Sequence, residues 1–332
     1  MDGVRWWLRA AGALVGLALL GGCGLTGSRD GEDAMRADER RIDGGPVLVP
    51  AEVWEQLGYE RPEAQRNPAV MRLALANREQ IYGVVQPYLE SMLGREVVLT
   101  GMSADRPSRA VGVQWRTVDE PVVSWSELVG LERDGTLFSD GSIARPTMIL
   151  AHETVSGLYL MAYRAEVAAL RAYLEATYPE FTALPSGYAQ AATRIDPMLW
   201  FQLEGGGEEF ARWEEATSAV FEAYGQRPVR SDREWRKVFE VETAGVGAEL
   251  VVTLMLRDPD AELSEDRLRE IAHDLADNPL LGRARVTRVV LSSNLMVRDS
   301  FAFHHELHLE WSDHLDDWYV QEWRDGGTVV SW

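Results

Sequence analysis

The sequence has very little cysteine or lysine: Cys23 and Lys237 are the only examples among 332 residues. A single cysteine excludes disulfide bonds within the chain. Because lysine is so rare, the positive charges are almost all arginine. The 53 Asp and Glu residues outnumber the 33 Lys and Arg residues, which gives a formal net charge of −20. A domain this acidic repels phosphate backbones, so we expect no nucleic-acid partner.

Common catalytic and cofactor motifs are also missing. The chain has no G-x-S-x-G elbow and no P-loop, and Gly245–Gly247 lacks the third glycine of a dinucleotide-binding loop. Acidic residues alternate from Asp258 to Glu262 as in a calcium loop, but Leu263 occupies the position that must be glycine. We therefore assign no catalytic residue, and we interpret the chain as a binding protein rather than an enzyme.

Near the start of the chain, the apolar run from Ala10 to Leu20 is only eleven residues long. A membrane-spanning helix needs about twenty. Arg5 and Arg9 precede the run, and small residues follow it directly before Cys23. This order of a basic start, a short apolar core and small residues at a cleavage site is typical of a secretory signal.

The four residues Leu20-Gly21-Gly22-Cys23 resemble the lipobox of bacterial lipoproteins, in which the cysteine is lipidated and becomes the new N-terminus. The resemblance covers residues 1–23. It implies a signal peptide over residues 1–22, a lipid on Cys23, and a protein exported and anchored on the extracytoplasmic face of the cell membrane. The position of the only cysteine at the end of a signal sequence supports this interpretation.

Beyond the signal, the composition predicts a tether and two folded units. Residues 23–50 are rich in Gly, Asp, Glu and Arg and are expected to form a flexible tether. Residues 182–195 mix Pro, Ser, Gly and Ala without periodicity, which indicates a linker. We expect an N-terminal α+β unit over residues 51–181 and a C-terminal α+β unit over residues 196–332.

The expected fold class is α+β, with antiparallel sheets and helices packed on one face. In the N-terminal unit, apolar spacing predicts helices over 68–93 and 167–174, and apolar runs predict strands over 96–102, 111–118, 121–129, 147–152 and 157–163. In the C-terminal unit we expect helices over 210–224 and 264–275, a hairpin of 235–243 with 249–257, and strands over 286–291 and 301–311. The order from 249 to 311 is similar to part of a ferredoxin-like sandwich, an analogy that carries no activity.

The richest group of metal-ligand side chains is the stretch HHELHLE, His304–Glu310. In a strand, His304, Glu306, His308 and Glu310 share one face, roughly 6–7 Å apart at each two-residue step. Two imidazoles and two carboxylates in this arrangement suit a divalent metal such as Zn²⁺. The other interpretation is the polar outer face of an amphipathic strand. The stretch is not a zincin motif, because only one residue separates Glu306 from His308.

Tryptophan is concentrated near the C-terminus, where Trp318 and Trp323 follow the His and Glu residues. Exposed tryptophan stacks on sugar rings, so these two residues are candidates for ligand stacking, although most tryptophans lie in protein cores. The leading hypothesis is a non-enzymatic binding module of the cell envelope, whose partner is an envelope protein or a cell-wall ligand. The alternatives are a divalent-metal-binding lipoprotein and a hydrolase acting on cell-wall glycans.

The anchoring hypothesis predicts the behaviour of a Cys23→Ala variant. Without the thiol no lipid is attached, and we expect the variant to leave the membrane fraction for the soluble extracytoplasmic fraction. Cell fractionation followed by immunoblotting measures this directly. Equal membrane retention of the variant and the wild type would contradict anchoring through Cys23.

Overall fold

The structure is a computed structural model that describes residues 39–41, 45–104, 109–137, 147–192, 194–204, 210–244, 246–276, 278, 284–312, 317–324 and 328–331. The chain divides into two compact units, Met1–Ala37 and Asp38–Trp332, and all described residues belong to the second. The predicted signal peptide, Cys23 and the first part of the tether lie outside the described residues. The predicted α+β class with mostly antiparallel sheets is confirmed.

The elements of the first half are β1 (Arg40–Arg41), β2 (Val47–Pro50), α2 (Ala51–Leu57), a 3₁₀ turn (Pro62–Ala64), α3 (Pro68–Ala76), α4 (Arg78–Leu93), β3 (Val97–Ser103), β4 (Ala110–Thr117), β5 (Ser124–Gly130), α5 (Thr147–Ala162) and α6 (Arg164–Thr177). Those of the second half are β6 (Phe181–Thr182), α7 (Ser186–Ala191), β7 (Leu199–Glu204), α8 (Phe210–Gln226), α9 (Asp232–Glu242), β8 (Gly247–Leu256), α10 (Glu265–Ala276), β9 (Ala284–Ser292), β10 (Leu295–Val297), β11 (His305–Ser312), β12 (Asp317–Arg324) and β13 (Thr328–Ser331).

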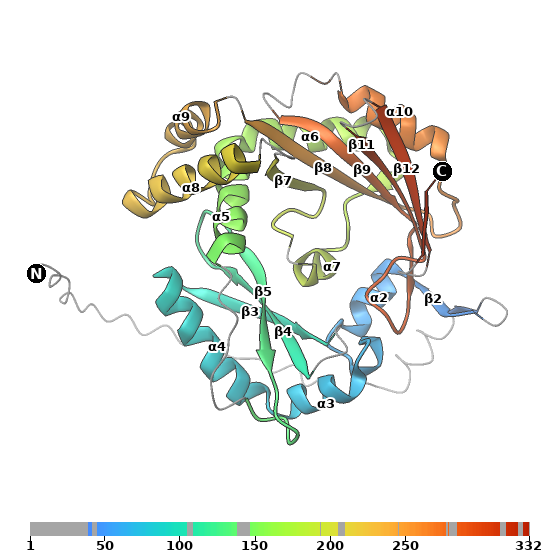
Figure 1. The fold of residues 1–332 in the computed structure, drawn as a ribbon. Coiled ribbons are helices and arrows are strands. Elements are labelled where there is room, and N and C mark those ends of the chain that lie inside the picture. The colour runs from blue at the N-terminus through green and yellow to red at the C-terminus, as the bar shows by residue number, and fades with distance from the viewer. Residues whose placement is uncertain are drawn as a thin grey trace, which may run out of the picture. The chain divides into compact units, whose positions relative to one another are not determined.

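The small antiparallel sheet β3-β4-β5 packs against α3 and α4 (Figure 1). The helix predicted over 68–93 is interrupted at Asn77, whose side-chain amide donates a hydrogen bond to the Leu73 carbonyl at 2.9 Å. Its predicted ends agree with the structure, because Asn67 caps α3 ahead of Pro68, and Gly94 adopts the left-handed conformation at φ +64° after α4.

The large sheet has the order β13-β12-β11-β9-β8-β6, and β7 also pairs with β8. β8 and β9 are parallel and are joined through α10, whereas the other pairs are antiparallel. A ferredoxin-like sheet splits the two parallel strands of such a unit, but here they pair directly. The sheet therefore does not show the ferredoxin-like arrangement expected from the sequence.

The main core lies between one face of the large sheet and the helices α5, α6, α8, α9 and α10. Alternate residues of β8, β9 and β11 enter it, for example Val252, Val289 and Leu309, which lie side by side on the three strands. A separate apolar cluster joins β2, α2 and β10 with Phe303, which packs against Tyr188. The main core thus occupies the face of the sheet that these five helices cover.

Two predicted strand regions are helical in the structure. The strands predicted over 147–152 and 157–163 lie almost entirely in α5, which runs from Thr147 to Ala162. Residues 235–243, predicted as half of a hairpin, lie mostly in α9. α5 contacts β5, β7, α6, α8 and α9, so it is surrounded by protein and lacks the polar stripe that identifies a surface helix. α9 has a capping box at Ser231 and Glu234 that the strand prediction overlooked.

The predicted linker and tether also contain ordered elements. Within residues 182–195 the chain forms the end of β6 and the helix α7, and Leu184 is buried. In the predicted tether, Val47–Pro50 forms β2, which pairs with β10 near the other end of the chain. The division into two independently folding units stays a prediction.

A carboxyl group is buried in the small sheet. Glu127 on β5 is 1% exposed and lies beside Trp115, which belongs to the apolar core between this sheet and its helices. Burial raises the pKa of Glu127 to about 7, although the neighbouring indole opposes the shift. The charged form is therefore disfavoured in the folded protein.

This burial predicts a pH-dependent effect of Glu127→Gln. Between pH 4.5 and about 7 the folded state binds more protons than the unfolded state, so wild-type stability falls as pH rises through that window. Each pKa unit corresponds to about 1.4 kcal/mol. From pH 4.5 to pH 8, we therefore expect the free energy of unfolding of the variant to rise by up to about 3 kcal/mol relative to that of the wild type. Urea unfolding at both pH values measures the gain, with the exposed Glu96→Gln as control. An equal difference at both pH values would contradict the prediction.

Candidate functional site

The stretch His304–Glu310 is divided between two places in the structure. β11 begins at His305, and the preceding residue, His304, donates its backbone N–H to the Leu295 carbonyl at 2.8 Å. His304 and His305 line a cavity at one end of the sheet. Leu307 and Leu309 of the same strand enter the main core. Glu306, His308 and Glu310 instead lie on the other face of the sheet. The predicted four-residue group is therefore not assembled as a unit.

The strand register places further polar residues on the same face as Glu306 and His308. Cross-strand pairing gives the rows Met255-Ser292-Glu306-Trp323, Thr253-Val290-His308-Gln321 and Val251-Arg288-Glu310-Tyr319. We call the polar members of these rows the polar sheet face: Thr253, Ser292, Arg288, Glu306, His308, Glu310, Tyr319, Gln321 and Trp323. In Figure 1, α7 lies on the opposite side of these strands from α10.

Hydrogen bonds and ion pairs connect this face. Ser292 Oγ donates to Glu306 Oε1 at 3.0 Å, and Arg288 forms an ion pair of 2.5 Å with Glu310. Arg194, which follows α7 in the chain, donates to Thr253 Oγ1 at 2.7 Å. These contacts bring a segment from outside the sheet onto its polar side.

Burial controls the ionisation of the two central residues. It lowers the pKa of His308 to about 4, assisted by the positive charges of Arg288 and Arg194. Burial also raises the pKa of Glu306, against the effects of the Ser292 hydrogen bond and the Arg194 charge. His308 is therefore a neutral imidazole at neutral pH.

These contacts bear on the metal hypothesis. His308 Nε2 and Glu306 Oε2 are 4.0 Å apart, and the charges of Arg194 and Arg288 reach the His308 ring. Two ligands fall short of the three or four protein ligands of a zinc site, and nearby guanidinium groups repel a cation. Within the described part of the chain, no group of three or more His, Cys, Asp or Glu side chains is arranged to hold a metal ion. A metal at these residues stays a prediction.

The cavity beside His304 and His305 has a volume of about 370 Å³. We call it the polar cavity, because most of its lining side chains are polar or ionisable. It lies just beyond the carboxyl ends of β8 and β9, the place where open sheets with parallel strands commonly bind ligands. Its lining residues are Arg40, Pro259, Asp260, Ala261, Glu262, Leu263, Ser293, Leu295, His304, His305 and Arg324.

Charges of both signs surround the polar cavity. Arg40 pairs with Asp260 at 2.5 Å on one side. On the other, Glu322 pairs with Arg324 at 2.6 Å and contacts His305 Nε2 at 3.0 Å. Burial, and then the Arg324 charge, lowers the pKa of His305. The cavity therefore offers guanidinium groups and carboxylates to the same occupant.

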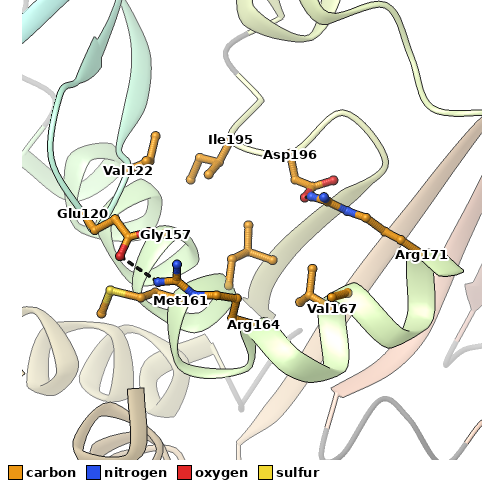
Figure 2. A pocket seen from close by; sticks show the side chains of 11 residues that line it. Glu120, Val122, Gly157, Met161, Arg164, Val167, Arg171, Ile195 and Asp196 are labelled. Atoms are coloured by element: carbon orange, nitrogen blue, oxygen red, sulfur yellow. Dashed lines mark hydrogen bonds and ion pairs between the residues drawn. The ribbon is translucent and has the colours of Figure 1, made fainter. Parts of the chain in front are cut away.

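A second cavity, of about 210 Å³, lies between the segment before β5 and the α5–α6 corner (Figure 2). Its middle is apolar, with Val122 and Met161 among the lining residues. Figure 2 shows an ion pair at each end: Glu120 with Arg164, at 2.7 Å, and Asp196 with Arg171. We call it the apolar cavity.

The two candidate stacking residues lie on opposite faces of the sheet. Trp318 packs edge-on against Trp311, at 5.7 Å between ring centroids, and joins the main core. Trp323 lies on the polar sheet face, where its ring stacks on His308 at 5.7 Å. The two residues therefore do not form one platform for a sugar.

Sequence reasoning missed the arginines of these sites. Arg194 lies in the segment interpreted as a linker, Arg40 in the predicted tether, and Arg288 and Arg324 on strands without a recognisable motif. Each is brought to its site by contacts between distant segments, for which the sequence carries no local signal. The lipobox residues Leu20, Gly21 and Gly22, together with Cys23, lie outside the described residues, and none of the described helices could span a bilayer.

Comparison with known proteins identifies a similar fold. No protein-family model matches the chain, and no curated protein matches its sequence. The fold is similar to that in the crystal structure of a DUF1672 family protein from Staphylococcus aureus, with a TM-score of 0.52 and 10% sequence identity. The match covers 85% of this chain and 98% of the other. At this identity the similarity concerns the fold alone.

The apolar cavity depends on a close approach that Gly157 permits. A Cβ atom at Gly157 would collide with the Val122 carbonyl oxygen, whereas a Cβ at Gly83, on the exposed side of α4, has no neighbour within 4 Å. We expect Gly157→Ala to lower the free energy of unfolding by about 1–3 kcal/mol through overpacking. Gly83→Ala should instead raise it by about 0.5–1 kcal/mol through helix propensity. Denaturant unfolding measures both, and equal effects would contradict the assigned close approach.

Proposed function

We propose that this protein is a lipid-anchored binding protein on the extracytoplasmic face of the cell membrane, which takes a small polar ligand in the polar cavity. The anchoring part of the proposal comes from the signal-like N-terminus and the lipobox resemblance at Cys23. The binding part is carried by one observation: a cavity of about 370 Å³ with both charge signs in its lining.

The size and chemistry of the polar cavity favour a zwitterionic ligand. Small-molecule sites commonly have volumes of about 300–1,000 Å³. Arg40 and Arg324 suit a carboxylate, because a guanidinium offers paired donors to its two oxygens. Asp260 and Glu262 suit an ammonium group. Free amino acids and short peptides carry both groups, and peptides of the cell wall belong to this class.

The two alternatives from the sequence have weaker support. For metal binding, His304 lies apart from Glu306 and His308, and the positive charges of Arg194 and Arg288 act on His308. For a glycan-active hydrolase, Trp318 and Trp323 do not face the same ligand. Both alternatives stay predictions, and the binding-protein proposal uses the described geometry more fully.

The proposal predicts stabilisation by zwitterions. In thermal unfolding of the full chain in detergent, we expect a saturable rise in Tm with at least one member of a panel of free amino acids and dipeptides. The matching C-terminal amides, which lack the carboxylate, should have a much smaller effect. A ligand at one hundred times its Kd stabilises by about 2.7 kcal/mol.

Arg324→Gln should abolish this rise. The control is Arg227→Gln, because Arg227 has a similar side-chain exposure of 62%, against 57% for Arg324, and also forms one surface ion pair. A rise that is unchanged in Arg324→Gln, or no rise with any zwitterion, would overturn the assignment of the polar cavity.

A further inference from the structure

Three buried nitrogen atoms on the polar sheet face have no hydrogen-bond partner. They are Arg288 Nε on β9, His308 Nε2 on β11 and Trp323 Nε1 on β12. In the strand register, Arg288 lies opposite Glu310 and Trp323 lies opposite Glu306. Glu306 and Glu310 are each two residues from His308 along β11. Arg288 and Trp323 are thus diagonal neighbours of His308, on the two strands that flank it.

The kind of atom left unpaired shows what the site lacks. Arginine Nε and the tryptophan indole nitrogen are donors only, and neutral histidine carries one N–H of its own. More than nine in ten buried polar groups in proteins have a partner, so unpaired atoms on three adjacent strands require an explanation. The missing partner of Arg288 Nε and Trp323 Nε1 is therefore an acceptor, and a metal ion cannot accept a hydrogen bond.

The local charge favours an acceptor that is negative. The positive charges of Arg288 and Arg194 both help to lower the pKa of His308. Arg194 donates to the Thr253 hydroxyl, and among the described residues no carboxylate lies within ion-pair distance of it. Arg194 therefore places a positive charge, without a paired carboxylate in the described part of the chain, on this face of a protein whose net charge is −20.

The acidic residues of the face offset only part of the positive charge. Glu310 offsets much of the Arg288 charge through their ion pair at 2.5 Å, which leaves Arg194 as the main source of positive charge. Glu306 accepts a hydrogen bond from Ser292, and its burial favours the protonated form. The Arg288 and Glu310 side chains are 34% and 25% exposed, so solvent reaches this end of the face.

We propose that the polar sheet face binds a small oxyanion, a carboxylate or a phosphate group, next to His308. Arg194 supplies most of the positive charge. Arg288 Nε–H and Trp323 Nε1–H donate hydrogen bonds to its oxygens, and His308 adds a third when Nε2 carries the ring proton. This site goes beyond the proposed function, because it lies on the other sheet face from the main core and takes a different ligand from the polar cavity.

The test is thermal unfolding of the full chain in detergent with sodium phosphate, sulfate or acetate, at ionic strength matched with sodium chloride. We expect a saturable rise in Tm with at least one of these anions. The preference between acetate and the two tetrahedral anions distinguishes a carboxylate site from a phosphate site. Arg194→Gln and Trp323→Phe should each weaken the apparent affinity at least tenfold.

Arg288→Gln should also weaken the apparent affinity. Its control is Arg298→Gln, since both side chains are 34% exposed and pair with a glutamate, with Asp299 a further 3.9 Å neighbour of Arg298. A direct readout on the wild type avoids any folding defect of the variants: the Trp323 indole N–H resonance, identified by its loss in Trp323→Phe, should shift with the same anion. No saturable Tm rise and no resonance shift with any anion would mean that ordered water alone satisfies these atoms, and would overturn the proposal. A rise of equal affinity in Arg194→Gln and Trp323→Phe would also overturn it, as would a response to Zn²⁺ but to no anion.

Discussion

The direct parallel pairing of β8 with β9 is the constraint on which the rest of the structure depends. Parallel strands are joined by a crossover, here α10, and are stable mainly when both faces are covered. On one face α10 and the other helices form the main core. On the other, the segment that carries Tyr188 and Arg194 lies against the sheet. Polar residues that would be solvated on an open sheet are consequently held in a confined environment.

This covering gives the two ends of the His304–Glu310 stretch different chemistry. His304 and His305 lie beyond the carboxyl ends of the parallel strands, beside arginines and carboxylates contributed by loops. Glu306 and His308 lie on the covered face, where burial disfavours the charged form of each. One strand therefore connects two places of different chemistry, and the covering segment contributes as much to that difference as the strand itself.

Local patterns predicted the parts of the fold that local physics controls. The capped helix starting at Pro68, the strands β3 to β5 and the alternation along β11 all follow from residue spacing and from single residues such as Asn67 and Gly94. α5 was mistaken for strands because a helix enclosed by protein has no polar stripe. The site could be predicted only as the alternation of Glu306 and His308, because Arg194 and Arg40 reach their places through contacts across long stretches of sequence.

The pairing of β2 with β10 has a consequence for the order in which the chain completes its fold. Asn294 accepts a hydrogen bond from the Ala51 N–H across 243 residues, and the Trp54 indole donates to the Ser300 carbonyl across 246. During synthesis at the ribosome, these partners emerge only after a further 243 and 246 residues have been made. Contacts between such distant residues form slowly because a very long loop must close first. The N-terminal strand and α2 thus remain without their native partners until residues 294–300 have been made.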